Sequence, residues 1–130
     1  MAGGGRVWLL RALAAVLVAA LAGCASADEP AVRDVASSFT AGDPQTRCDL
    51  LATATLTSVQ ADGACPEAIA ALPLGSGDVV SVEVWGEDAL VHLTDDTLFL
   101  TREDAGWRVS AGACEAAGAD RPYACQLEAS

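Results

Sequence analysis

The side chains best able to do chemistry in this 130-residue chain are five cysteines and a single histidine. The cysteines are Cys24, Cys48, Cys65, Cys114 and Cys125. Their spacing contains no C-x-x-C pair of the kind that holds zinc, and His92 lies far from each of them in the sequence. We therefore expect neither a metal nor another cofactor. No serine stands in a G-x-S-x-G turn, so nucleophilic hydrolysis has no support.

The acidic residues argue against a nucleic-acid partner. All 18 lie after Cys24, and the five arginines in that part of the chain leave it a formal charge of −13. Such a surface repels nucleic acids and anionic lipid head groups. Because no D-x-D-x-D-G calcium loop is present, we interpret the acidic residues as a means of staying soluble outside the cell.

The first 23 residues have the charge order of an export signal. Arg6 and Arg11 come before an apolar stretch from Ala12 to Leu21, and no acidic residue occurs in this part. That stretch of about ten residues is too short to span a bilayer, which takes about 20. Residues 21–24 read Leu-Ala-Gly-Cys, which resembles the lipobox of bacterial lipoproteins.

The lipobox resemblance implies that residues 1–23 are a signal peptide that is removed and that Cys24 carries diacylglyceryl. Lipid on Cys24 would hold the protein at the outer face of the cytoplasmic membrane, since two acyl chains together give stable anchoring. Residues 24–29 would then form a short tether and residues 30–130 a single domain. The alternative is plain secretion without lipid.

Lipidation of Cys24 also explains the odd number of cysteines in an exported chain. The other four allow three disulfide pairings. We favour the local one, Cys48–Cys65 with Cys114–Cys125, because each pair flanks one compact, turn-rich segment. Each bridge would stabilise the fold by about 3 kcal/mol, mainly by restricting the unfolded chain.

The hydropathy pattern is helical in the first half of the mature chain and alternating in the second. It predicts a helix from Asp28 or Pro30 to Gly42, a second helix capped by Asp43, a weakly helical stretch over 53–63, and a short helix from Cys65 that ends before Pro73. Four strands follow, near residues 78–85, 88–94, 97–102 and 107–112.

Hairpin-length connections between these strands predict the register of the sheet. Counting across the turns pairs Val84 with Ala89, Val82 with Val91, Leu93 with Leu98, and Leu100 with Val109. All of these share one apolar face with Val80, Trp107 and Ala111, and we expect that face to meet the helices.

The opposite face of the sheet is mixed in character. Trp85, Leu90 and Phe99 form an apolar patch there beside His92, which makes these four residues our candidate interface. The alternative is that a helix or the C-terminal tail covers them.

The order of elements resembles the nuclear transport factor 2-like cone fold, an α+β arrangement with helices packed on a curved antiparallel meander. The resemblance rests on the helices before the meander and on the strand Gly106-Trp107-Arg108-Val109. It is closest to small actinobacterial lipoproteins of this type, which share the lipobox, the later cysteines and Pro122-Tyr123-Ala124-Cys125. Such folds host isomerases, dehydratases and binding domains.

The cone-fold enzymes related to ketosteroid isomerase hold an acid, base or phenol inside the cone, where an apolar setting tunes its pKa. The apolar face predicted here has no such group on its strands. We therefore expect a membrane-anchored, non-enzymatic module that holds a small apolar ligand around Val91 and Leu100, or presents the mixed face to an envelope protein. The alternatives are an isomerase-like or dehydratase-like enzyme with an acid from a helix (Asp34 or Asp49), or a structural protein that forms homodimers through Trp85, His92 and Phe99.

Overall fold

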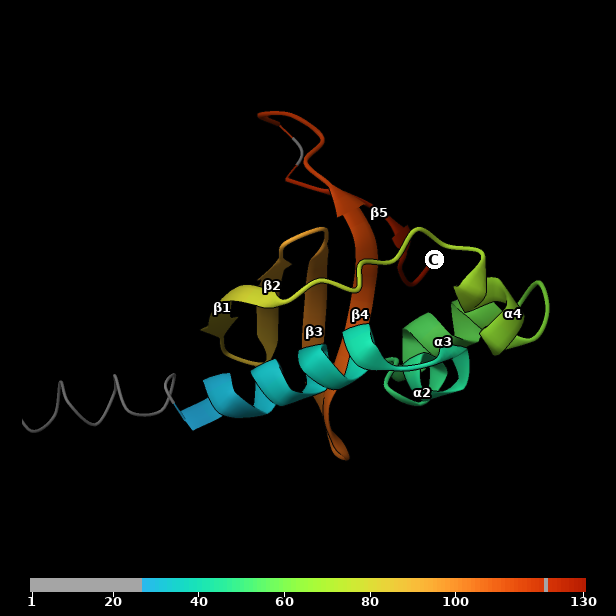
Figure 1. Ribbon diagram of the computed structural model, residues 1–130, viewed down its shortest axis with the longest axis horizontal. Coiled ribbons are helices and arrows are strands. Elements are labelled where there is room, and N and C mark those ends of the chain that lie inside the picture. The colour runs from blue at the N-terminus through green and yellow to red at the C-terminus, as the bar shows by residue number, and fades with distance from the viewer. Residues whose placement is uncertain (1–26, 121) are drawn as a thin grey trace, which may run out of the picture.

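The computed structural model describes residues 27–120 and 122–130. Helices come first in this part of the chain and an antiparallel sheet follows, so the fold is α+β (Figure 1). The predicted signal peptide and the predicted lipidation site Cys24 lie outside the described residues. No helix in the described ranges is both long and apolar enough to cross a bilayer.

The first helix spans residues 27–41. Val32, Ala36 and Phe39 lie about one turn apart and are completely buried, so they form the apolar face of this helix. The helix ends before Gly42, as expected, and it includes residues 27–29, which the sequence analysis assigns to the tether.

Three short helices follow, α2 (Pro44–Asp49), α3 (Thr53–Gln60) and α4 (Cys65–Ala70). The Asp43 side chain accepts a hydrogen bond from the Thr46 N–H at 2.8 Å, which confirms it as the cap of α2. A disulfide between Cys48 and Cys65 joins α2 to α4, and both cysteines are buried.

The sheet has five strands in the order β1-β2-β3-β4-β5 and does not close on itself. They are β1 (Val79–Trp85), β2 (Asp88–Leu93), β3 (Thr97–Glu103), β4 (Gly106–Glu115) and β5 (Ala124–Leu127). The first four match the predicted strands closely. The fifth was not predicted, because its four residues are too few to show an alternating pattern. Cys114 on β4 faces Cys125 on β5, and the second disulfide joins them.

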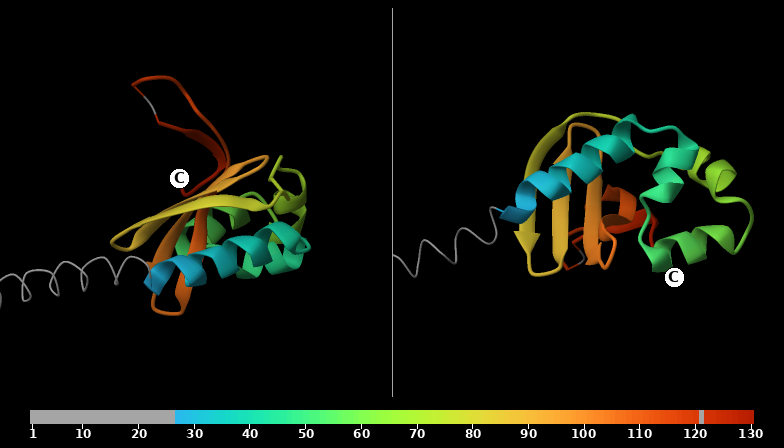
Figure 2. Two further views of the ribbon diagram at one scale, coloured as in Figure 1. Left: turned by 60° about the vertical axis from the view of Figure 1, so that its left-hand side comes forward. Right: turned by 90° about the horizontal axis from the view of Figure 1, so that it is seen from below.

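The helices lie on one side of the sheet (Figure 2). The first helix crosses one face, while α2, α3 and α4 gather beside β4. The segment before α3 pairs with β4 directly, since the Ala52 N–H donates to the Val109 carbonyl and the Val109 N–H donates to the Leu50 carbonyl, both at 2.8 Å. Glu103 of β3 accepts hydrogen bonds from the Thr53 backbone and so caps α3 from across the domain.

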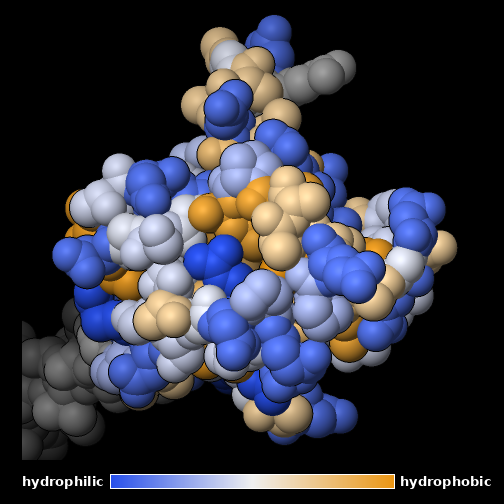
Figure 3. Space-filling model, turned by 45° about the vertical axis from the view of Figure 1, so that its right-hand side comes forward, coloured by the Kyte–Doolittle hydropathy of each residue, from blue (hydrophilic) through white to orange (hydrophobic). Residues whose placement is uncertain are grey.

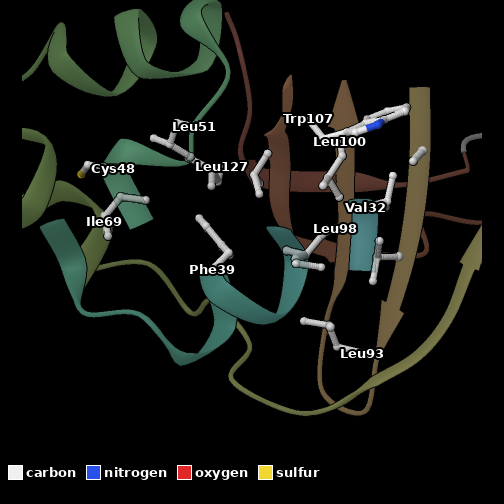
Figure 4. Packing of buried hydrophobic residues seen from close by; sticks show 14 of the residues in the cluster. Val32, Phe39, Cys48, Leu51, Ile69, Leu93, Leu98, Leu100, Trp107 and Leu127 are labelled. Atoms are coloured by element: carbon white, nitrogen blue, oxygen red, sulfur yellow. The ribbon is translucent and has the colours of Figure 1, made fainter. Parts of the chain in front are cut away.

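The core fills the space between this sheet face and the helices (Figure 4). Leu98, Leu100 and Val109 of the sheet are at most 1% exposed. They meet Val32 and Phe39 from the first helix in one hydrophobic cluster. This face is therefore occupied by the protein's own side chains.

The predicted pairs Val82–Val91, Val84–Ala89 and Leu100–Val109 are confirmed. The pair Leu93–Leu98 is wrong: Val91 faces Leu98. The β2–β3 turn consists of Thr94 and Asp95, with the Leu93 N–H bonded to the Asp96 carbonyl at 2.9 Å. The register therefore differs by two residues, which leaves every side chain on its predicted face.

Asp96 gives a physical reason for this turn. Its carboxylate accepts four backbone N–H bonds of 2.7–3.0 Å, from Gly75, Thr97, Ala113 and Cys114. Among these donors, Ala113 has a φ of 51°, a left-handed conformation that is unfavourable for alanine. With Asp96 just after the turn, one side chain holds the segment before β1, the start of β3 and the bend in β4.

Two other assignments to the apolar face are also corrected. Val80 sits in an irregularity of β1, where the register shifts between Val79 and Ser81, and it is 62% exposed. A second shift lies between Phe99 and Leu100, so that Ala111 pairs with Phe99 and lies on the mixed face instead of the predicted apolar face. Each shift inserts one unpaired residue and reverses the alternation that simple counting assumes.

Candidate functional site

A hollow of about 660 Å³ lies on the sheet face opposite the core. Its floor is a row of side chains that are neighbours across the strands: Glu83 on β1 faces Leu90 on β2, which faces Phe99 on β3, which faces Ala111 on β4. The corrected register creates this row, because the predicted one had placed Thr101 beside Leu90. The floor is thus part of hydrogen-bonded sheet.

One wall comes from the chain between β4 and β5. The Cys114–Cys125 disulfide closes this segment at its base, and Pro122, Tyr123 and Cys125 line the hollow. The Tyr123 ring meets the Phe99 ring edge-on, with 5.4 Å between the ring centres and 75° between their planes. The segment projects beyond the end of the sheet (Figures 1 and 2).

All four residues of the predicted interface line this hollow: Trp85, Leu90, His92 and Phe99. Leu90 is only 6% exposed, whereas Trp85 is 51% exposed. The centre of the mixed face at Leu90 is therefore shielded from solvent, whereas its rim at Trp85 is exposed.

The predicted ligand position around Val91 and Leu100 is not hollow. Val91 is completely buried and Leu100 is 1% exposed, and both belong to the core cluster. A space for a ligand exists instead on the other face of the same strands.

The polar groups of the hollow include two acids. Glu83 and Glu128 line it, together with Ser110 and His92, whose Nδ1 lies 3.4 Å from the Thr97 hydroxyl. Its lining among the described residues contains no arginine. Glu83 and Glu128 were not predicted as site residues, and the only sequence signal for Glu128 is its place just after Cys125, which the disulfide returns to β4.

Of the proposed acids on helices, Asp49 lines a second hollow of about 490 Å³, together with polar residues such as Gln60 and apolar ones such as Leu51. Asp34 and Asp49 are exposed, and Asp49 accepts a hydrogen bond from the Gln45 side chain at 2.9 Å. Within the described ranges, no three residues of the types His, Cys, Asp and Glu come together as a metal site would require.

The helical side of the molecule offers a different surface (Figure 3). Hydrophilic residues dominate it, and the largest visible hydrophobic area lies near its centre, below the projecting β4–β5 segment. Small hydrophobic areas of this kind are normal for a soluble domain.

In comparisons with family models, with curated proteins and with solved structures, no match to this chain was found.

Proposed function

We propose that this chain is an exported lipoprotein that binds a small ligand without transforming it. Lipid on Cys24 would hold it at the outer face of the cytoplasmic membrane. The leader sequence supports export, and so do the two disulfides, because such bonds persist in oxidising compartments. The cone fold of nuclear transport factor 2-like proteins, which we propose for the domain, is supported by helices that cover one face of an antiparallel sheet.

The observation that carries the binding proposal is the hollow on the mixed face. Its floor is hydrogen-bonded sheet and its wall is held by a disulfide, so the aromatic side chains are positioned before any ligand arrives. Preorganised sites of this kind lose less entropy on binding. Ligand sites are typically concave and mostly apolar with a few polar groups, which describes this lining.

Native mass spectrometry of the full chain in detergent, incubated with a metabolite and lipid extract of its source cells, tests this proposal. We expect a discrete mass adduct that Trp85→Ala removes or strongly reduces. Val80→Ala is a matched control, because Val80 lies on the same strand, is also more than half exposed to solvent and does not line the hollow.

The absence of any adduct, or equal loss in both variants, would contradict ligand binding at the hollow. A species of twice the chain mass that Trp85→Ala abolishes would instead support a homodimer. The exposure of Trp85 and Val80 on the edge strand β1 is the observation that favours this second candidate.

A further inference from the structure

We infer that the ligand of the hollow is a small organic cation with an apolar body, such as a substituted ammonium compound. This inference rests on the proposed binding function and names the chemical class that the site recognises.

Aromatic side chains supply the first part of the argument. Trp85, Phe99 and Tyr123 line one hollow from two strands and the β4–β5 segment. The face of an aromatic ring carries partial negative charge and attracts a cation, most strongly for tryptophan. Trp85 is half exposed, so its ring is accessible to a ligand that enters from solvent.

Two carboxylates supply the second part. Glu83 lies in the floor row beside Leu90, and Glu128 lines the hollow from just after β5, the strand at the other edge of the sheet from β1. The ion pairs among the described residues are Arg33–Glu29 and Arg102–Asp28, and they involve neither of these glutamates. A ligand that carries positive charge would meet both an aromatic and an anionic surface.

The charge of the hollow also discriminates against other ligands. An anion would approach the two carboxylates of Glu83 and Glu128 and be repelled by them. A neutral apolar molecule would shield the carboxylates from water without pairing them, which costs free energy. The same apolar floor with a basic lining would have favoured a fatty acid, so charge decides between these ligand classes.

Isothermal titration of the full chain in detergent with three probes of similar size tests the inference. The probes are benzyltrimethylammonium, the neutral benzyl alcohol and the anionic phenylacetate. We expect saturable binding of the cation, at least tenfold tighter than either of the others. Glu83→Gln and Glu128→Gln keep the shape of each side chain while removing its charge.

Each of these variants should weaken the cation by about three- to tenfold, the usual range for one cation–carboxylate or cation–π contact. Neither should change the affinity for benzyl alcohol. Glu67→Gln is the control, because Glu67 is an exposed acid on α4 that does not line the hollow.

If benzyl alcohol binds more tightly than the cation, or if the two glutamate variants have no effect, the inference of a cationic ligand is overturned. A mass adduct from the extract would in that case still support ligand binding at the hollow. Failure of the cation to bind at millimolar concentration would also overturn the inference. A short basic peptide that binds more tightly than benzyltrimethylammonium, and does so through Glu83, would replace the small cation with a protein partner.

Discussion

Asp95 and Asp96 are adjacent acids that hold the same segment before β1. The Asp95 carboxylate accepts the backbone N–H groups of Ser76 at 3.0 Å and Gly77 at 2.9 Å, while Asp96 accepts that of Gly75. A side-chain methyl group on Gly75 would fall 2.4 Å from the Asp96 Cβ, so only glycine fits there without rearrangement. Two neighbouring carboxylates thus set the path of the chain as it leaves the helices and enters the sheet.

The hydrogen bonds to Asp95 make a pH-dependent contribution to stability. Those from Ser76 and Gly77 hold the pKa of the Asp95 carboxyl below its ordinary value of 3.8. Because the folded state favours the ionised form, the stabilisation is complete above about pH 3.8 and is lost as the pH falls through the lower, folded-state pKa.

We therefore expect Asp95→Asn to lower the free energy of unfolding at pH 7 and to have a smaller effect at pH 3. Urea unfolding at both pH values measures the difference. Asp104→Asn is the control, since it removes the same charge from an exposed turn between β3 and β4. A loss that is equal at both pH values would show that the side chain acts through packing rather than charge.

At the scale of elements, the alternating hydropathy pattern predicted four strands, but it did not predict the β2–β3 turn or the strand β5. The alternation from Val82 to Val109 was sufficient to predict four strands and the face that each turns to the core. Because one face is buried, a strand can shift by two residues and keep that face buried, but it cannot shift by one. The β2–β3 turn depends on where the Asp96 carboxylate finds donors in distant segments, which no local pattern contains. The same holds for β5, which pairs with β4 beside the disulfide.

The candidate site, too, was predictable only where the strand pattern reaches. The patch of Trp85, Leu90, His92 and Phe99 was predictable, because alternation alone places those residues on one face. Tyr123 and Glu128 belong to the site only because the chain returns after β4. Their positions are tertiary information that the sequence pattern does not carry.

The two disulfides should differ in what they support. Cys48–Cys65 joins two helices of the core, whereas Cys114–Cys125 holds the segment that walls the hollow. We expect Cys48→Ala/Cys65→Ala to cost about 3 kcal/mol of unfolding free energy, as for other closed loops of this length. Below its unfolding temperature it should keep the ligand adduct of the parent chain.

We expect Cys114→Ala/Cys125→Ala to lose most of the adduct even where circular dichroism shows the fold intact, because Tyr123 would no longer be held against Phe99. Native mass spectrometry and thermal unfolding of the two double variants give the comparison. If both variants lose the adduct in proportion to their loss of stability, the β4–β5 segment has no separate part in binding.

For the whole molecule, the lipid that we propose on Cys24 is the property that would set its location. We expect the full chain, produced in a bacterium with a lipoprotein pathway, to enter the detergent phase on Triton X-114 partitioning. Cys24→Ser should move it to the aqueous phase, because the thioether that carries the lipid can no longer form. Ser26→Ala is the control, and detergent-phase recovery of Cys24→Ser would contradict lipidation at this residue.

The sheet separates the hydrophobic core on one face from the hollow on the other, and this separation bears on how such a protein diverges. Along β2 and β3, residues that stabilise the fold alternate with residues that contact the hollow, so mutation can alter one set while the other stays constant. Proteins that descend from one ancestor can therefore acquire different ligand preferences through changes at Trp85, Glu83 and the β4–β5 segment, while the core keeps each of them folded. We expect paralogues of this chain to retain the apolar strand positions and to vary most in the lining of the hollow.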